Sequence, residues 1–169
     1  MAQVRIAGIV PESVVDGPGF RYTIFTQGCR HNCKGCHNPQ THDFEGGYTA
    51  DTDDLFAEMM SDPLIKGITL SGGDPFEQPA PLAELAAKAH SAGKDIITYT
   101  GYTYEQLLAK SDEEPAVMDL LRETDVLIDG RFILEQRNLE LKFRGSENQR
   151  VIDVKKSLAS GSVVTFEFE

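Results

Sequence analysis

The sequence contains no long apolar run, few cysteines and a shortage of positive charge. No stretch approaches the roughly 18–20 consecutive apolar residues of a membrane-spanning helix. The first ten residues lack the cleavage site of a signal peptide. A formal net charge of −11 argues against general nucleic-acid binding, which favours a basic surface. These absences predict a cytoplasmic protein whose partners include neither a membrane nor a nucleic acid.

Only three cysteines are present, Cys29, Cys33 and Cys36, and all of them lie within eight residues. An odd number of thiols in so short a loop is poorly suited to structural disulfides, so a disulfide-stabilised secreted domain is not expected. Clustered thiols in a cytosolic chain more often bind a metal.

The length of 169 residues, with 40% hydrophobic and 25% charged residues, predicts one globular domain over residues 1–169. The charge is unevenly distributed. Residues 42–125 carry 18 Asp or Glu but five Lys or Arg, whereas residues 131–156 carry four and seven. The acidic part is typical of solvated helix faces, and the basic part suits an anionic ligand or partner. Both interpretations can hold together.

Short β-rich runs alternate with helical patterns along the chain. Strands are predicted at residues 4–10, 21–26, 67–70, 95–100, 125–128, 150–154 and 162–168. Helices are predicted at residues 52–61, 79–92, 104–110 and 115–122. This order predicts an α/β fold with a mainly parallel sheet and outer helices. Such sheets bind ligands at the carboxyl ends of their strands.

The cysteines follow the second predicted strand directly, with the spacing Cys-x3-Cys-x2-Cys. Three thiolates from one short loop can bind three corners of a cubane iron–sulfur cluster and leave its fourth iron open to a chelating small molecule. A structural zinc site needs four ligands, so zinc would require His31 or His37 as the fourth. Reduced thiols without a metal are a third interpretation. A histidine in such a polar loop is more often a surface hydrogen-bonding residue.

Three other predicted strands end in candidate binding residues. The run Ser71-Gly72-Gly73-Asp74-Pro75 has two glycines that permit a close approach of the backbone to a ligand and free donor groups. An ordinary turn has the same composition. Asp129 is placed either to accept hydrogen bonds from ribose hydroxyls or to turn the chain before Gly130. Tyr99-Thr100-Gly101 ends on the same carboxyl edge of the sheet.

The cysteine loop resembles that of the radical S-adenosylmethionine superfamily. The run VDGPGFR at residues 15–21, followed by FTQGCRHNCKGCHNPQT at residues 25–41, is similar to the activating enzymes of glycyl-radical enzymes. The run FILEQRNLELKFRGSENQRVIDV at residues 132–154 resembles one subgroup, the activating proteins of anaerobic ribonucleoside-triphosphate reductases. The resemblance covers nearly the whole chain.

This resemblance implies a small, incomplete TIM-like barrel that holds one 4Fe–4S cluster and binds S-adenosylmethionine. The site residues that it implies are Cys29, Cys33 and Cys36 for the irons, and Gly72, Gly73, Asp74 and Asp129 for S-adenosylmethionine. Reductive cleavage of that cofactor would give a 5′-deoxyadenosyl radical, which would abstract hydrogen from a glycine of the reductase. The implied partners are the large subunit of that reductase and a flavodoxin-like electron donor, which would suit the basic residues Arg30 and Lys34.

Two motifs and three alternatives remain open at this point. The resemblance places the loop of Asp16 near the entry of the partner's polypeptide. The donor-rich segment 144–150 would bind the cofactor's carboxylate or the partner's backbone, or pair with the acidic part of the chain. The alternatives are an activase of pyruvate formate-lyase or another glycyl-radical enzyme, a non-catalytic zinc-binding module, and an electron carrier. Chain length and segment 144–150 favour the reductase, and the Gly72–Asp74 loop argues against a carrier.

Overall fold

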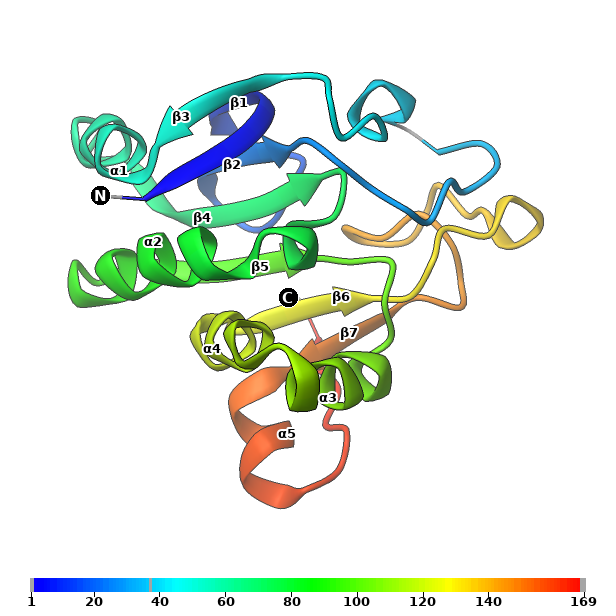
Figure 1. Cartoon of the computed structure of the whole chain (residues 1–169). Coiled ribbons are helices and arrows are strands. Elements are labelled where there is room, and N and C mark those ends of the chain that lie inside the picture. Colours follow the sequence, from blue (N-terminus) through cyan, green and yellow to red (C-terminus); the bar gives the residue numbers. More distant parts are fainter. Residues whose placement is uncertain (1, 37, 168–169) are drawn as a thin grey trace.

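One mixed sheet organises the computed structural model, which describes residues 2–36 and 38–167. Its strands follow the order β3-β1-β2-β4-β5-β6-β7 (Figure 1). They are β1 (Gln3–Ser13), β2 (Phe20–Thr26), β3 (Tyr48–Asp51), β4 (Ile65–Gly72), β5 (Asp95–Tyr99), β6 (Val126–Asp129) and β7 (Arg150–Asp153). The central strands β2, β4, β5 and β6 are parallel. β1, β3 and β7 pair antiparallel at the two sides. The α/β prediction is confirmed, and the antiparallel edges are an addition to it.

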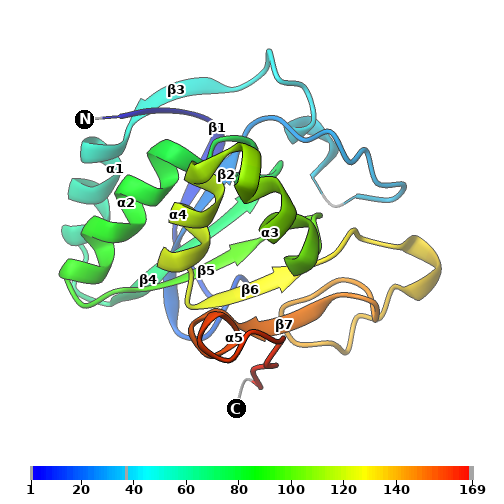
Figure 2. The ribbon, with the colours of Figure 1, turned by 60° about the horizontal axis from the view of Figure 1, so that its bottom comes forward.

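Helices cover one face of this sheet. The α-helices of the described part are α1 (Thr52–Met60), α2 (Pro79–Ser91), α3 (Tyr104–Glu113), α4 (Pro115–Glu123) and α5 (Val154–Ser160). Figure 2 shows α1 to α4 on one side of the sheet and α5 beside β7. Within the described residues, none of the helices has the length and apolar character that a membrane crossing requires.

The two faces of the central strands differ because successive side chains of a strand point to opposite sides. One set packs against the helices and forms the main core, with Ile24, Leu70 and Ile96 at most 1% exposed. The helices contribute the buried leucines Leu82, Leu85, Leu107, Leu120 and Leu121 to this core. The alternate positions Ile97, Val126 and Ile128 form a second, smaller cluster. In the described part of the chain, α1 to α4 lie on the opposite face from this cluster (Figure 2).

Local signals explain where the helices begin. Asp51 caps α1 by accepting a hydrogen bond from the N–H of Asp53. Thr103 and Gln106 form a capping box at the start of α3. Prolines occupy the first turns of α2 and α4, where the missing N–H costs nothing. All four helices predicted from the sequence are confirmed with these starts.

Three differences from the predicted elements lie at the edges of the sheet. β3 and α5 were not predicted. The strand expected at residues 162–168 is wrong over its described part, because Thr165 forms only an isolated bridge to Ile152. Phe168 lies outside the described residues. Gly161, in a left-handed conformation with φ 78°, ends α5 just before this segment.

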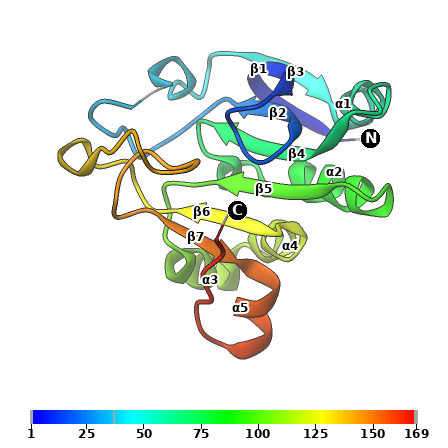
Figure 3. The same ribbon diagram turned by 180° about the vertical axis from the view of Figure 1, so that it is seen from behind.

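The parallel arrangement brings the loops after β2 and β6 together. The cysteine loop (blue) and the β6–β7 connection (yellow to orange) lie side by side at the carboxyl edge of the sheet in Figures 1 and 3. A Cβ placed on Gly35 would lie 2.9 Å from Cδ1 of Leu134, so the two loops are in contact. This edge therefore combines segments about 100 residues apart in the sequence.

Candidate functional site

A cavity of about 580 Å³ opens at the carboxyl ends of the parallel strands. Phe25, Ser71 and Tyr99 line it from β2, β4 and β5, at strand positions alternate to those that pack on the helices. The cavity is therefore on the face of the sheet opposite α1 to α4. Its lining also includes the sequence-predicted residues Cys29, Cys33, Cys36, Gly72 and Gly73.

The three cysteines surround this cavity as half-buried free thiols. Among residues 2–36 and 38–167, no three His, Cys, Asp or Glu side chains are close enough together to hold a single metal ion. The thiols thus line a shared space and do not converge on one point. A cubane cluster binds each cysteine at a different iron, and cysteine thiolates are its usual ligands. The donor set fits such a cluster.

Backbone N–H groups face all three cysteine sulfurs, and that of Asn38 donates to Sγ of Cys36 at 3.4 Å. Burial raises the pKa of Cys29 to about 11, and hydrogen bonds from the N–H groups of His31 and Asn32 oppose this effect. Burial also raises the pKa of Cys33, where the N–H of Phe132 opposes it. These N–H groups favour the thiolate, which is the form that binds iron. Phe132 comes from the β6–β7 connection, so that segment contacts the cysteine loop at a sulfur.

Gly72, which ends β4, and Gly73 pack directly on the backbone at the end of β2 and the start of the cysteine loop. A Cβ on Gly72, whose φ is +94°, would lie 2.4 Å from the nitrogen of Thr26, and one on Gly73 would lie 2.4 Å from the carbonyl oxygen of Gly28. The N–H groups of Gly73 and Asp74 donate to the carbonyls of Thr26 and Gly28 at 2.8 and 2.9 Å. Of the two glycines expected to offer free donors, Gly73 therefore does not, because its N–H is bonded to Thr26. Close approach is what requires glycine here.

Asp74 lies behind the cavity wall, and its residue is only 1% exposed. Its carboxylate accepts hydrogen bonds from Nε2 of His31 at 2.7 Å and from Oγ1 of Thr100 at 2.9 and 3.0 Å. The N–H groups of Gly101 and Phe76 donate to it at 2.9 and 3.0 Å. Donors of the chain itself therefore occupy both carboxylate oxygens.

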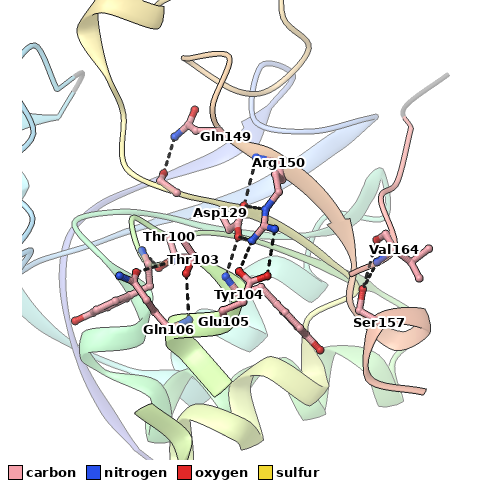
Figure 4. Close-up of polar contacts among 12 residues, drawn as sticks. Thr100, Thr103, Tyr104, Glu105, Gln106, Asp129, Gln149, Arg150, Ser157 and Val164 are labelled. Atoms are coloured by element: carbon pink, nitrogen blue, oxygen red, sulfur yellow. Dashed lines mark hydrogen bonds and ion pairs between the residues drawn. The ribbon is translucent and has the colours of Figure 1, made fainter. Parts of the chain in front are cut away.

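Asp129 lines a second, polar cleft of about 420 Å³, next to the cavity of the cysteines. Its residue is 1% exposed, and its carboxylate accepts from the guanidinium of Arg150 at 2.5 and 3.1 Å. The N–H of Tyr104 donates to it at 2.8 Å (Figure 4). Arg150 also pairs with Glu105 at 2.6 Å, and the hydrogen bonds to both carboxylates raise the pKa of Arg150. Asp129 thus joins β6, β7 and the start of α3.

The donors of segment 144–150 are largely used inside the β6–β7 connection. Oε1 of Gln149 accepts from the N–H of Gly145 at 2.8 Å, and its Nε2 donates to the carbonyl of Gly130 at 3.0 Å. Nδ2 of Asn148 donates to the carbonyl of Arg131 at 2.8 Å. Pairing with the acidic part of the chain, one of the three alternatives for this segment, holds for Arg150, which bonds to Glu105. The bonds of Asn148 and Gln149 to the chain's own backbone were not predicted.

Asp16 lines the cavity from the loop that joins β1 to β2. Oγ of Ser13 donates to its carboxylate, and Oγ1 of Thr69 donates to its carbonyl at 2.9 Å. Val15, the residue before it, is 74% exposed at the cavity mouth. The loop is therefore anchored by Asp16 while an apolar side chain faces outward.

Comparison with known proteins adds a family to this geometry. A family model described as a 4Fe-4S single cluster domain matches residues 15–152. The anaerobic ribonucleoside-triphosphate reductase-activating protein of Vibrio cholerae is 41% identical over 148 residues, which cover 82% of this chain and 91% of that protein. The proteins of the same name from Escherichia coli K12 and Enterobacteria phage T4 are 39% and 36% identical, and the aligned parts cover 93% and 90% of those proteins. In this chain, those alignments cover 83% and 85% of the residues.

The chain belongs to the anaerobic ribonucleoside-triphosphate reductase-activating proteins. Membership in this family decides between the interpretations of the cysteines, because the matched domain is one with a single 4Fe–4S cluster. Zinc binding and unliganded thiols lose their support. These relatives are named for the reductase and not for pyruvate formate-lyase.

Sequence reasoning missed several residues that this family member places at the site. His31 is not a surface residue, because its side chain is 4% exposed and hydrogen-bonded to Asp74. His37, the other histidine considered for zinc, lies outside the described residues. Phe132 carried no signal, since its contact to Cys33 uses a backbone N–H that every non-proline residue has. The assignment of Gly72, Gly73, Asp74 and Asp129 to S-adenosylmethionine remains a prediction.

Proposed function

We propose that this protein generates the glycyl radical of an anaerobic ribonucleoside-triphosphate reductase, with one 4Fe–4S cluster and S-adenosylmethionine as its cofactors. The observation that carries this proposal is a family-typical cysteine loop whose three free thiols line one cavity at the carboxyl edge of the sheet. When bound, the cluster supplies the electron that cleaves the sulfonium carbon–sulfur bond of S-adenosylmethionine.

The chain's own residues would hold and orient these groups. Cys29, Cys33 and Cys36 bind three irons. The backbone at Gly72 and Gly73 meets the amino group of S-adenosylmethionine, which donates hydrogen bonds and therefore needs acceptors. Asp74 would take part by holding this loop in place, since its carboxylate accepts from four residues of the chain and its N–H and carbonyl are bonded to Gly28 and Glu77.

Asp129 enters the proposal indirectly. Its carboxylate is held by Arg150 and by the N–H of Tyr104, so it supports the strand end at Gly130, which lines the cavity. Because donors of the chain already bond to this carboxylate, we propose that it stabilises the wall of the cofactor site and does not bind a ribose.

The proposed radical chemistry needs a cavity closed to water, and the reductase would supply the missing wall. We propose that the sheet is an incomplete TIM-like barrel, because β3 and β7 are the two ends of its strand order. Apolar side chains lie at the opening: Val15, Leu141 and Phe143 line the cavity, and Val15 is 74% exposed. Such a rim suits the polypeptide of the large subunit.

The remaining proposals concern the electron donor and the compartment. Arg30 and Lys34 flank the first two cysteines, and the side chain of Arg30 is 62% exposed. An acidic, flavodoxin-like donor would meet this basic pair close to the cluster. One domain working in the cytoplasm is consistent with reduced cysteines.

Anaerobic reconstitution with iron and sulfide tests the cofactor assignment. After reduction and addition of S-adenosylmethionine, we expect about four irons per chain and the release of 5′-deoxyadenosine. The variant Cys33→Ala should lose both, because one iron has lost its ligand. One zinc per chain, with no colour and no nucleoside from the wild type, would overturn the proposal.

A further inference from the structure

His31 belongs to the cysteine loop, but its side chain reaches into the loop after β4. Its Nε2 lies 2.7 Å from Oδ2 of Asp74. The side chains are 4% and 1% exposed, so this contact is shielded from water. A hydrogen bond to a buried carboxylate is stronger than one at the surface, and its loss leaves a costly unpaired group.

Gly101 and Tyr102 pack closely against the imidazole ring of His31, which lies at the cavity wall. A Cβ on Gly101 would lie 2.5 Å from its Cδ2. The ring of Tyr102 meets it edge to face, with 4.5 Å between the ring centroids. The hydroxyl of Tyr102 is in turn held by Glu77 at 2.6 Å. These contacts fix both the place and the orientation of the imidazole.

The position of His31 in the chain makes this contact informative. It lies two residues after Cys29 and two before Cys33, whereas Asp74 directly follows Gly73. Its own N–H faces the sulfur of Cys29 while its imidazole holds Asp74. A single residue therefore connects the proposed iron ligands to the proposed S-adenosylmethionine loop. Residues just outside a metal's ligand shell commonly orient that shell through such carboxylate–imidazole contacts.

We propose that His31 is a positioning residue that fixes the cysteine loop against the Gly72–Asp74 loop and so couples iron ligation to S-adenosylmethionine binding. This inference rests on the proposed function of the site. His31 would touch neither the iron nor the substrate, and it would act through Asp74.

The neighbouring residue Arg30 offers a matched control. It also bonds to the loop after β4, through Glu77 at 2.6 Å, where the side chain of Arg30 is 62% exposed and that of Glu77 is 2% exposed. Water and salt screen the exposed guanidinium, and Glu77 keeps the hydrogen bond from the hydroxyl of Tyr102 when Arg30 is removed. Removing either side chain breaks one contact between the same two loops, but only His31 is buried.

The test compares the reconstituted variants His31→Ala, His31→Gln and Arg30→Ala with the wild type. The dissociation constant of S-adenosylmethionine is measured from the change that it causes in the EPR spectrum of the reduced cluster. We expect His31→Ala to bind about 10–100-fold more weakly. His31→Gln should recover most of this loss, because its amide can donate near the position of Nε2. Arg30→Ala should stay within roughly threefold. Equal affinities of His31→Ala and the wild type would overturn the proposal.

Hydrogen exchange of the apo-protein gives a readout that does not depend on the cluster. The N–H of Asp74 donates to the carbonyl of Gly28, and that of Gly101 donates to Asp74. Both amides should exchange faster in His31→Ala and unchanged in Arg30→Ala. Unchanged exchange in His31→Ala contradicts the inference even if that variant fails to load iron. A wild type that makes no 5′-deoxyadenosine would instead contradict the proposed function alone.

Discussion

At the scale of single residues, two buried carboxylates organise the edge of the sheet. Asp74 lies two residues after β4 and Asp129 is the last residue of β6, and both residues are 1% exposed. A buried charge is tolerated only when it is paired and hydrogen-bonded. His31 and Thr100 satisfy Asp74, and Arg150 satisfies Asp129. Each carboxylate therefore acts as a fixed point of the cavity wall.

Breaking the Asp129–Arg150 contact should destabilise the fold. We expect Asp129→Asn to lower the free energy of unfolding by about 2 kcal/mol, because it leaves the partly buried guanidinium of Arg150 with a weaker partner. The side chain of Glu105, the other partner of this arginine, is 60% exposed. The variant Glu105→Gln should therefore lower the free energy of unfolding by only about 0.5 kcal/mol. Denaturant unfolding of the apo-protein measures both values. Equal losses in the two variants would contradict this ranking.

Sequence reasoning located these carboxylates but not their partners. A strand end followed by Gly or Pro is a local signal, and it correctly placed both aspartates at the carboxyl edge. The partners His31 and Arg150 lie 43 and 21 residues away, and only the folded chain brings them together. Contact of either carboxylate with S-adenosylmethionine remains a prediction, and these partners are the reason we propose a supporting role for both.

At the scale of elements, the β6–β7 connection forms part of the cysteine site. The N–H of Phe132 bonds to the sulfur of Cys33, and Leu134 packs on Gly35. This connection also carries the apolar rim residues Leu141 and Phe143. Contacts made by a partner at the rim would thus lie in the same segment as a hydrogen bond to a proposed iron ligand.

Removing that hydrogen bond should change the reduction potential of the reconstituted cluster. Phe132→Pro has no N–H to donate, so the extra negative charge of the reduced cluster loses a stabilising dipole. We expect a potential lower by roughly 20–60 mV, the equivalent of one modest hydrogen bond. Phe132→Leu keeps the N–H and should match the wild type. Spectroelectrochemical titration measures both, and a shift as large in Phe132→Leu would count against the N–H as its cause.

Elements with their own periodicity were predictable, and those made by tertiary contacts were not. The helix at α2 has leucines and alanines at helical spacing between proline and glycine, and it was predicted within one residue. β3 has only four residues and is a strand because Tyr48–Asp51 pairs with the start of β1. The predicted last strand failed because α5 uses the preceding residues and leaves one isolated bridge. Pairing partners distant in sequence leave little local signal.

At the scale of the whole molecule, the acidic helices and the candidate site are on opposite faces of the sheet. Helices α1 to α4 fall within the strongly acidic residues 42–125 and cover one face of the sheet (Figure 2). The cavity opens on the other face, where Arg144 contributes to its lining. The charge pattern, which the sequence alone revealed, thus matches a solvated helix layer and a separate surface for partners.

We expect this protein to generate a glycyl radical on an anaerobic ribonucleoside-triphosphate reductase. The most direct measurement mixes the reconstituted, reduced protein and S-adenosylmethionine with the reductase large subunit, and records the EPR spectrum under anaerobic conditions. We predict a glycyl radical on the reductase and the appearance of nucleotide reduction, with neither in Cys33→Ala. We predict no radical when pyruvate formate-lyase replaces the reductase. S-adenosylmethionine cleavage without a radical on the reductase would contradict the proposed activation of the reductase. A radical on pyruvate formate-lyase instead would contradict it as well.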